Sequence, residues 1–162
     1  MTEKKDPSEC CPPFDPEPWD YKTFDWKDKL FIQDSVNQFF HIPLNMGRVV
    51  TRMWNSIEQA GARPADKDFI MLAYDPSPWK SEIYMTVIKE VPDALNVRLS
   101  GNFLSRVFDG PYNAVPKWFK EMESYARASG KKAVKQYFYF TTCPKCAKKY
   151  GHNYVVAFAQ VE

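Results

Sequence analysis

The chain has 162 residues, of which 44% are hydrophobic and 16% aromatic, so it is long enough for one domain or for two small halves that share a core. Lysine and arginine number 22 and aspartate and glutamate 20, a balance that disfavours non-specific binding to nucleic acid or acidic membranes. No apolar run approaches the roughly 20 residues that span a bilayer. Because no apolar segment follows the N-terminal charges, we expect a cytoplasmic protein whose cysteines are reduced or metal-bound.

We expect residues 1–27 to form an extended arm on the surface of a domain that spans residues 28–162. The first 18 residues contain five prolines, which exclude a helix or a central strand. The aromatic side chains between residues 14 and 26 argue against a solvated tail, because disordered segments are poor in aromatic residues. A flexible leader remains the alternative for residues 1–9.

Residues 28–92 have the order strand, helix, strand, strand. Residues 28–40 are rich in strand formers, and an apolar stripe at helical spacing predicts a helix from about Met46 to Ala60. Residues 69–74 form a continuous apolar strand that ends at a turn rich in proline. In residues 82–91 apolar side chains alternate with polar or aromatic ones, which predicts a strand whose two faces differ.

Residues 93–162 repeat this order. A strand with alternating side chains ends at the turn Asp109–Pro111, where glycine and proline favour a reversal of the chain. Asn113 is the expected N-cap of a long amphipathic helix that Gly130 ends. Two further strands are expected over residues 137–140 and 154–161.

The two segments correspond part by part. Pro43–Asn45 and Pro111–Asn113 precede the two helices, and Gly61 and Gly130 follow them. We therefore interpret the chain as a duplicated β-α-β-β unit, with copies over about 28–92 and 93–162, although apolar helix stripes also resemble one another by chance. The predicted class is α+β: an eight-stranded antiparallel curved sheet with two long helices on one face and an aromatic-lined groove where the halves meet.

Aromatic side chains are the candidates for the wall of this groove. Tyrosine hydroxyls on an apolar wall orient a ligand, an arrangement more typical of binding than of catalysis. Trp54 and Trp118 lie on the apolar stripes of the helices, so we assign them to the core. The candidate ligand-binding residues are Trp79, Tyr84, Phe108, Tyr112, Tyr137 and Tyr139.

Glu82 and Glu121 are the candidate catalytic carboxylates. Glu82 alternates with Tyr84 on a predicted strand, and among aromatic rings it could act as a general acid or base or pair with a cationic ligand. The alternative is a solvated side chain that faces Lys80 or Lys89.

Cys143 and Cys146 have the C-x-x-C spacing with which two thiolates bind one zinc ion. Zinc needs four ligands, and Cys10–Cys11, His152 or His41 would supply the others. Plain surface thiols are the alternative to such a structural zinc site. The sequence requires no other cofactor.

The element order, the turn Phe108–Tyr112 (FDGPY) and the turn that leads to Glu82–Tyr84 resemble the GyrI-like small-molecule-binding domain, over about residues 28–161. This resemblance implies that a bulky, often aromatic or cationic, small molecule binds in the central groove. It also implies an alternative, because one branch of the family hydrolyses reactive cyclopropane-bearing toxins with a glutamate and neighbouring aromatics. One position departs from the pattern: the groove acid expected two residues before Tyr139 is Tyr137.

We therefore expect a small-molecule-binding protein that sequesters or senses its ligand. The alternative is a hydrolase of reactive small molecules in the same groove, with Glu82 or Glu121 activating water. A third alternative is an interaction protein that zinc holds together. The expected partner is a small molecule, with no nucleic acid and no membrane, and the chain is expected to be a monomer or a homodimer.

Overall fold

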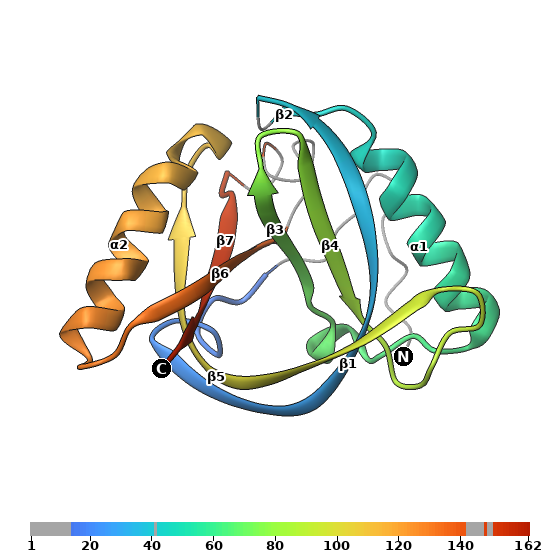
Figure 1. Cartoon of the computed structure of the whole chain (residues 1–162), viewed down its shortest axis with the longest axis horizontal. Helices are drawn as coiled ribbons and strands as arrows, with labels where there is room; N and C mark the ends of the chain where they lie inside the picture. Colours follow the sequence, from blue (N-terminus) through green and yellow to red (C-terminus); the bar gives the residue numbers. More distant parts are fainter. Residues whose placement is uncertain (1–13, 41, 142–147, 149–150) are drawn as a thin grey trace.

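The computed structural model describes residues 14–40, 42–141, 148 and 151–162. Six antiparallel strands form one sheet that closes into a barrel, and two helices lie outside it (Figure 1). The strands of the barrel are β1 (Lys22–Phe39), β3 (Met71–Ser77), β4 (Lys80–Thr86), β5 (Leu95–Asp109), β6 (Ala133–Phe140) and β7 (Tyr154–Val161). The other elements are the short strand β2 (Ile42–Pro43), the helices α1 (Met46–Ala60) and α2 (Val115–Ala128), and the 3-10 turns η1 (Asp66–Asp68) and η2 (Tyr112–Ala114).

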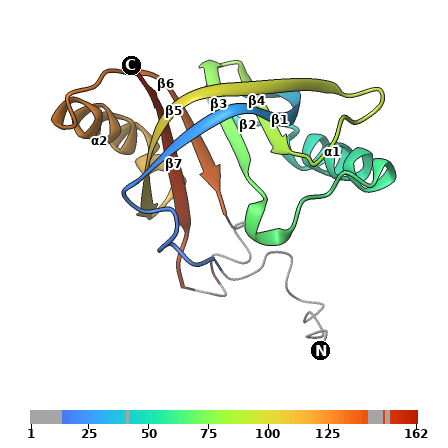
Figure 2. The ribbon, with the colours of Figure 1, turned by 90° about the horizontal axis from the view of Figure 1, so that it is seen from below.

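The two long strands close the barrel. β1 pairs with β5 from Lys22–Ser105 to Gln33–Leu95, and with β4 from Phe31–Thr86 to Asn37–Lys80. β5 pairs in turn with β7, so each long strand contributes to both halves of the molecule. Figure 2 shows β1 and β5 running side by side across the barrel.

A local irregularity bends these strands. The register of β1 and β5 shifts between Trp26 and Lys29, and Asp28 has a positive φ of 50°. Opposite Trp26 lies Gly101, whose φ of 140° is unfavourable for a residue with a Cβ atom. A bulge of this kind increases local twist and lets a long strand turn around a barrel.

The predicted open sheet of eight strands with both helices on one face is therefore wrong. The main strand of each half runs through as one element of 18 or 15 residues, so there are fewer strands than expected. The pairing of β1 with β5 joins edges that were expected to stay open. Once the sheet is closed, α1 and α2 cover opposite sides of it (Figure 1).

Each helix covers its own part of the barrel with an apolar face. The predicted helix Met46–Ala60 is confirmed with these bounds, and Gly61 ends it in the left-handed conformation. Val49, Met53 and Ile57 of α1 are buried against β1 and β4. The corresponding face of α2, buried against β5, β6 and β7, consists of Trp118, Met122 and Ala126.

A third cluster of side chains fills the barrel interior. Its members are aromatic or aliphatic and come from all six barrel strands and from the segment before β1. The buried ones are Trp26, Phe31, Ile70, Leu72, Tyr84, Phe103, Tyr137, Val156 and Phe158, and the half-buried ones include Phe14, Trp19, Phe24, Tyr74 and Tyr139. Where an open groove was predicted, the structure therefore has a packed interior, because closure brings the aromatic faces of both halves together.

Candidate functional site

Alternation along β4 separates two environments. Ile83 and Met85 face α1, whereas Tyr84 belongs to the interior cluster. Glu82 lies two residues from Tyr84 and so on the interior face, where its cross-strand neighbours are Tyr74 of β3 and Ser35 of β1. The predicted difference between the two faces of this strand is confirmed.

The Glu82 carboxylate is held by a tyrosine of its own strand. The Tyr84 hydroxyl donates a hydrogen bond to Glu82 Oε2 at 2.8 Å. Tyr84 is only 4% exposed, whereas Glu82 is half-buried and so remains within reach of solvent. The carboxylate is already fixed by a buried donor. Ligand binding therefore costs it less conformational entropy than it would cost an exposed glutamate.

Tyr137 brings strand β6 to the same place. Its ring meets that of Tyr84 edge to face at 5.8 Å and that of Tyr74 at 5.7 Å. Lys135, two residues earlier on β6, places its ammonium group 4.1 Å from the ring centre of Tyr74 and 5.0 Å from that of Tyr137. We call these five residues, Glu82, Tyr84, Tyr74, Tyr137 and Lys135, the acid–tyrosine cluster.

Two hydroxyls of the cluster are harder to ionise than usual. Burial raises the pKa of Tyr84, and its hydrogen bond to Glu82 and the charge of that carboxylate raise it further. Burial, followed by the charges of Tyr74 and Glu82, raises the pKa of Tyr137 to about 12. Both side chains therefore stay neutral hydrogen-bond donors across the physiological range.

The cluster lies beside a weak seam of the barrel. Within the described residues, β3 and β6 pair through Ala73 and Phe138, which are the chain neighbours of Tyr74 and Tyr137. The seam joins the two halves of the chain, as Figure 1 shows. Few backbone hydrogen bonds resist a local separation of the strands at this point.

The other predicted ligand-binding residues lie elsewhere. Tyr139 belongs to the interior cluster, and its ring contacts include Phe14 and Trp19. The Phe108 ring stacks on Trp118 at 5.3 Å under α2, so it is part of the core. Trp79 is 52% exposed at the turn between β3 and β4. Tyr112 lies in η2, and its side chain is outside the described part of the chain.

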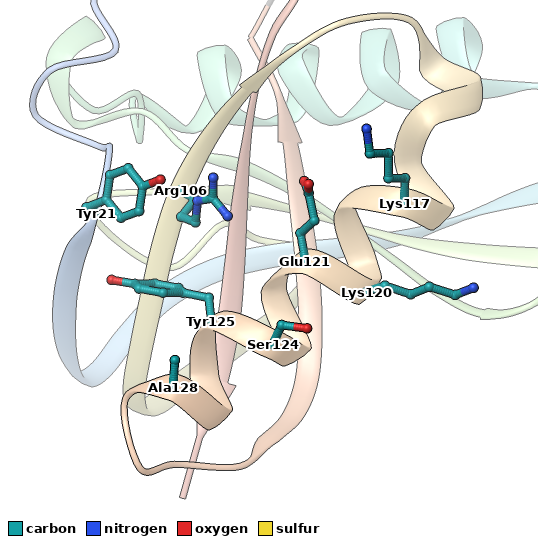
Figure 3. Close-up of a pocket in the computed structure, with 8 residues that line it drawn as sticks. All are labelled: Tyr21, Arg106, Lys117, Lys120, Glu121, Ser124, Tyr125 and Ala128. Carbon is teal, nitrogen blue, oxygen red and sulfur yellow. The ribbon is translucent and has the colours of Figure 1, made fainter.

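Glu121 lies apart from the acid–tyrosine cluster. It is half-buried on α2 and lines a surface pocket whose wall contains no member of that cluster (Figure 3). The two candidate glutamates are therefore not brought together, and Glu82 is the one that faces the barrel interior.

Cys143 and Cys146 lie outside the described residues. Among residues 14–40, 42–141, 148 and 151–162, no group of three or more His, Cys, Asp or Glu side chains is arranged to hold a metal ion. Over the same residues, no helix has both the length and the apolar character needed to cross a bilayer.

Sequence reasoning missed Tyr74 and Lys135. The signal for Tyr74 was the proline-rich turn between two strands, because a hairpin there places Tyr74 opposite Glu82. Lys135 shares a strand face with Tyr137 by simple alternation. Without the closed barrel, however, nothing in the sequence places this face of β6 against β3.

Residues 1–161 match the sequence model of a protein family described as bacterial hydrolase. The chain belongs to this family. No protein with curated annotation matches the chain in sequence. This match does not name the GyrI-like family that the sequence resembles, and the likeness to solved structures that follows concerns the fold alone.

Several solved structures share the fold of this chain at low sequence identity. The C-terminal domain of EcmrR has a TM-score of 0.68 and 8% identity, over 89% of this chain and 98% of that one. A hydrolase from Listeria innocua has a TM-score of 0.63 and 11% identity, over 88% and 92%. SAV2435 bound to tetraphenylphosphonium has a TM-score of 0.50 and 10% identity, over 88% and 94%.

Proposed function

We propose that this protein binds a bulky aromatic small molecule, with a preference for positively charged ones, at the acid–tyrosine cluster. The observation that carries the proposal is the half-buried Glu82 carboxylate, fixed by the Tyr84 hydroxyl at 2.8 Å beside the rings of Tyr74 and Tyr137. Such a constellation offers a charge, a polar anchor and apolar ring surface within one site.

The rings of this site already hold a cation. The Lys135 ammonium lies over Tyr74 and Tyr137, the arrangement in which the negative face of an aromatic ring attracts positive charge. A ligand cation would take the same position and would also face the Glu82 carboxylate. The site therefore has the chemistry for a lipophilic cation, provided that Lys135 moves aside.

The burial of the acid–tyrosine cluster limits the size of a ligand that can enter without a change in the barrel. Tyr84 and Tyr137 are 4% and 1% exposed, whereas Glu82, Tyr74 and Lys135 are half-buried. A small group can therefore reach the three half-buried residues directly. A bulky ligand needs the seam between β3 and β6 to open, where the pairing is weakest.

One similar structure supports this assignment in chemical class. SAV2435 was solved with tetraphenylphosphonium, a bulky aromatic cation. The EcmrR C-terminal domain has the same fold over nearly its whole length. Sequence identity to these structures is near 10%, so the residues of the site are assigned from the geometry of this chain alone.

The test is a calorimetric titration with tetraphenylphosphonium, and with neutral triphenylphosphine oxide as the matched ligand. We expect the cation to bind more tightly than the oxide, and Glu82→Gln to raise the Kd of the cation about tenfold, as expected for the loss of a half-buried opposite charge. Glu123→Gln, on the exposed face of α2, is the control variant and should leave the Kd unchanged. Equal affinity of wild type and Glu82→Gln would contradict the proposal.

Hydrolysis at the same site is the second candidate. The description of the family and the similar Listeria hydrolase favour it. Glu82 would take a proton from water, the water oxygen would bond to an electrophilic carbon, and the strained bond of the substrate would break with its electron pair taking up a proton. Catalytic consumption of a cyclopropane-bearing electrophile, abolished in Glu82→Gln, would establish this activity. Stoichiometric protection without turnover would leave binding as the function.

A further inference from the structure

A surface pocket beside α2 is lined by an arginine, Arg106, that has no anionic partner among the described residues. The pocket has a volume of about 500 Å³ and lies between α2, β5 and the segment before β1 (Figure 3). Its lining residues are Tyr21, Arg106, Lys117, Lys120, Glu121, Ser124, Tyr125 and Ala128. It shares no residue with the acid–tyrosine cluster, so a ligand site in this pocket does not depend on the proposed function.

Aromatic rings hold the Arg106 guanidinium in place. Its central carbon lies 4.8 Å from the ring centre of Tyr21, 4.9 Å from that of Phe108 and 5.9 Å from that of Tyr125. The rings of Tyr21 and Tyr125 meet edge to face at 5.6 Å. Contacts with ring faces restrain a guanidinium while leaving its N–H edge free to donate hydrogen bonds.

The donors of Arg106 are unused within the described part of the chain. Its Nε is buried and has no hydrogen-bond partner, and no carboxylate there forms an ion pair with it. A buried donor without a partner costs free energy, and a fixed guanidinium fork matches the two oxygens of a carboxylate. Because Nε itself is buried, the arrangement favours an anion that reaches the terminal N–H groups of the guanidinium.

The charged side chains that line the pocket determine how strongly it attracts an anion. Lys117 and Lys120 lie on the same face of α2 as Glu121, so the lining carries three positive charges and one negative charge. In Figure 3 the Lys120 side chain extends away from Arg106, whereas the Glu121 carboxylate lies on the same side of α2 as the guanidinium. The net charge of the lining is positive, so the pocket attracts an anion, and Glu121 weakens that attraction.

We propose that this pocket is a second ligand site, which binds small aromatic monocarboxylates through Arg106. The carboxylate accepts hydrogen bonds from the guanidinium fork, and the aromatic body of the ligand packs on Tyr21 and Tyr125. Lys117 adds a longer-range attraction, and Glu121 limits the affinity.

Calorimetry with 2-naphthoate tests the site, with neutral 2-naphthamide as the matched ligand. We expect naphthoate to bind at least about tenfold more tightly than the amide, and added salt to weaken its binding. Arg106→Gln should raise the Kd of naphthoate about tenfold or more. Arg106→Lys should raise it less, because lysine keeps the charge and loses the fork. Arg98→Gln, on the same strand but outside the pocket, should leave the Kd unchanged.

The direction in which Glu121→Gln changes the Kd of naphthoate is the decisive test. If the pocket binds an anion, removal of this carboxylate should lower the Kd of naphthoate about threefold, and this variant leaves the aromatic packing of Arg106 intact. Equal affinity for naphthoate and naphthamide, weaker binding in Glu121→Gln, or a loss of binding in Glu82→Gln in place of Arg106→Gln would each overturn the proposal. Thermal melting of every variant shows whether a lost signal reflects unfolding.

Discussion

Single residues define the acid–tyrosine cluster through their position on a strand face. Glu82 and Tyr84 are two residues apart, so both point into the barrel, and the hydroxyl reaches the carboxylate within one strand. Their environment then differs with depth, because Tyr84 is buried and Glu82 is half-buried. This gradient lets one residue act as a fixed support and the other as the group that meets a ligand.

The buried tyrosines predict how stability depends on alkaline pH. The pKa values of Tyr84 and Tyr137 are raised above the usual 10.0, so the native state keeps protons that the unfolded chain loses. Their contribution is complete below pH 10 and is lost as the pH rises through the native values. We expect the free energy of unfolding, measured in urea from pH 8 to pH 11, to fall above about pH 10, by up to about 1.4 kcal/mol per pH unit for each tyrosine.

Tyr84→Phe should flatten this fall, because phenylalanine has no proton to lose. At neutral pH the same variant should lose about 1 kcal/mol through its hydrogen bond to Glu82. Tyr21→Phe, at a position that is 58% exposed, should leave the slope as in the wild type. Parallel slopes for Tyr84→Phe and wild type would show that this hydroxyl is not the group responsible.

Lys135 predicts the selectivity of the proposed binding site. Its ammonium occupies the position over Tyr74 and Tyr137 that a ligand cation would need, and it repels such a cation. Lys135→Met keeps the length of the side chain and removes the charge, so it should lower the Kd of tetraphenylphosphonium about fivefold, as expected for a cation–π contact of about 1 kcal/mol. Lys131→Met, exposed before β6, should have no effect. Weaker binding in Lys135→Met would mean that the amine assists the ligand.

At the scale of elements, the bend of the long strands decides the fold. The shifted register after Trp26 and the unusual backbone of Gly101 opposite it bend β1 and β5 beyond the ordinary twist of paired strands. A pair with ordinary twist would extend the sheet, whereas this more strongly bent pair carries it around to the other half. The same bend turns the ends of β1 toward the two helices on opposite sides (Figure 1).

Gly101→Ala should therefore destabilise the protein by about 1–3 kcal/mol, because φ is 140° there. The added Cβ would also lie 3.0 Å from Gln160 Nε2, a contact that the flexible amide can relieve. Gly47→Ala is the matched control in the first turn of α1, where a Cβ meets nothing within 4 Å. It should stabilise the protein by up to about 1 kcal/mol through helix propensity. Denaturation in urea gives both values, and equal effects of the two substitutions would contradict the role of the bend.

At the scale of the whole molecule, the interior cluster couples the two halves. Each helix has its own apolar cluster, but the barrel interior takes side chains from β1, β3 and β4 as well as β5, β6 and β7. Phe14 and Trp19, from the segment expected to be a surface arm, also pack into this interior. If one half unfolded, the interior side chains of the other half would become exposed to solvent. The two halves are therefore expected to unfold together.

Phe158→Ala tests this coupling. Phe158 is fully buried and contacts the rings of Trp19, Phe24 and Trp26. Its loss should cost about 3–5 kcal/mol. Circular dichroism and tryptophan fluorescence should still report one coincident transition. Phe119→Ala, at a position that is 44% exposed, should cost less than about 1 kcal/mol. Two separate transitions in Phe158→Ala would show that the halves unfold independently.

Local periodicity in the sequence was sufficient to predict α1 with its bounds, and to place Glu82 and Tyr84 on a strand face distinct from that of Ile83 and Met85. These features depend on neighbours within a few residues, where spacing along the chain translates directly into direction. The pairing of β1 with β5 joins residues more than 60 positions apart, and no local pattern specifies it. The tertiary structure alone therefore decided the closed barrel, its filled interior, the position of Lys135 beside Tyr74, and the pocket around Arg106, because each depends on which distant strands become neighbours.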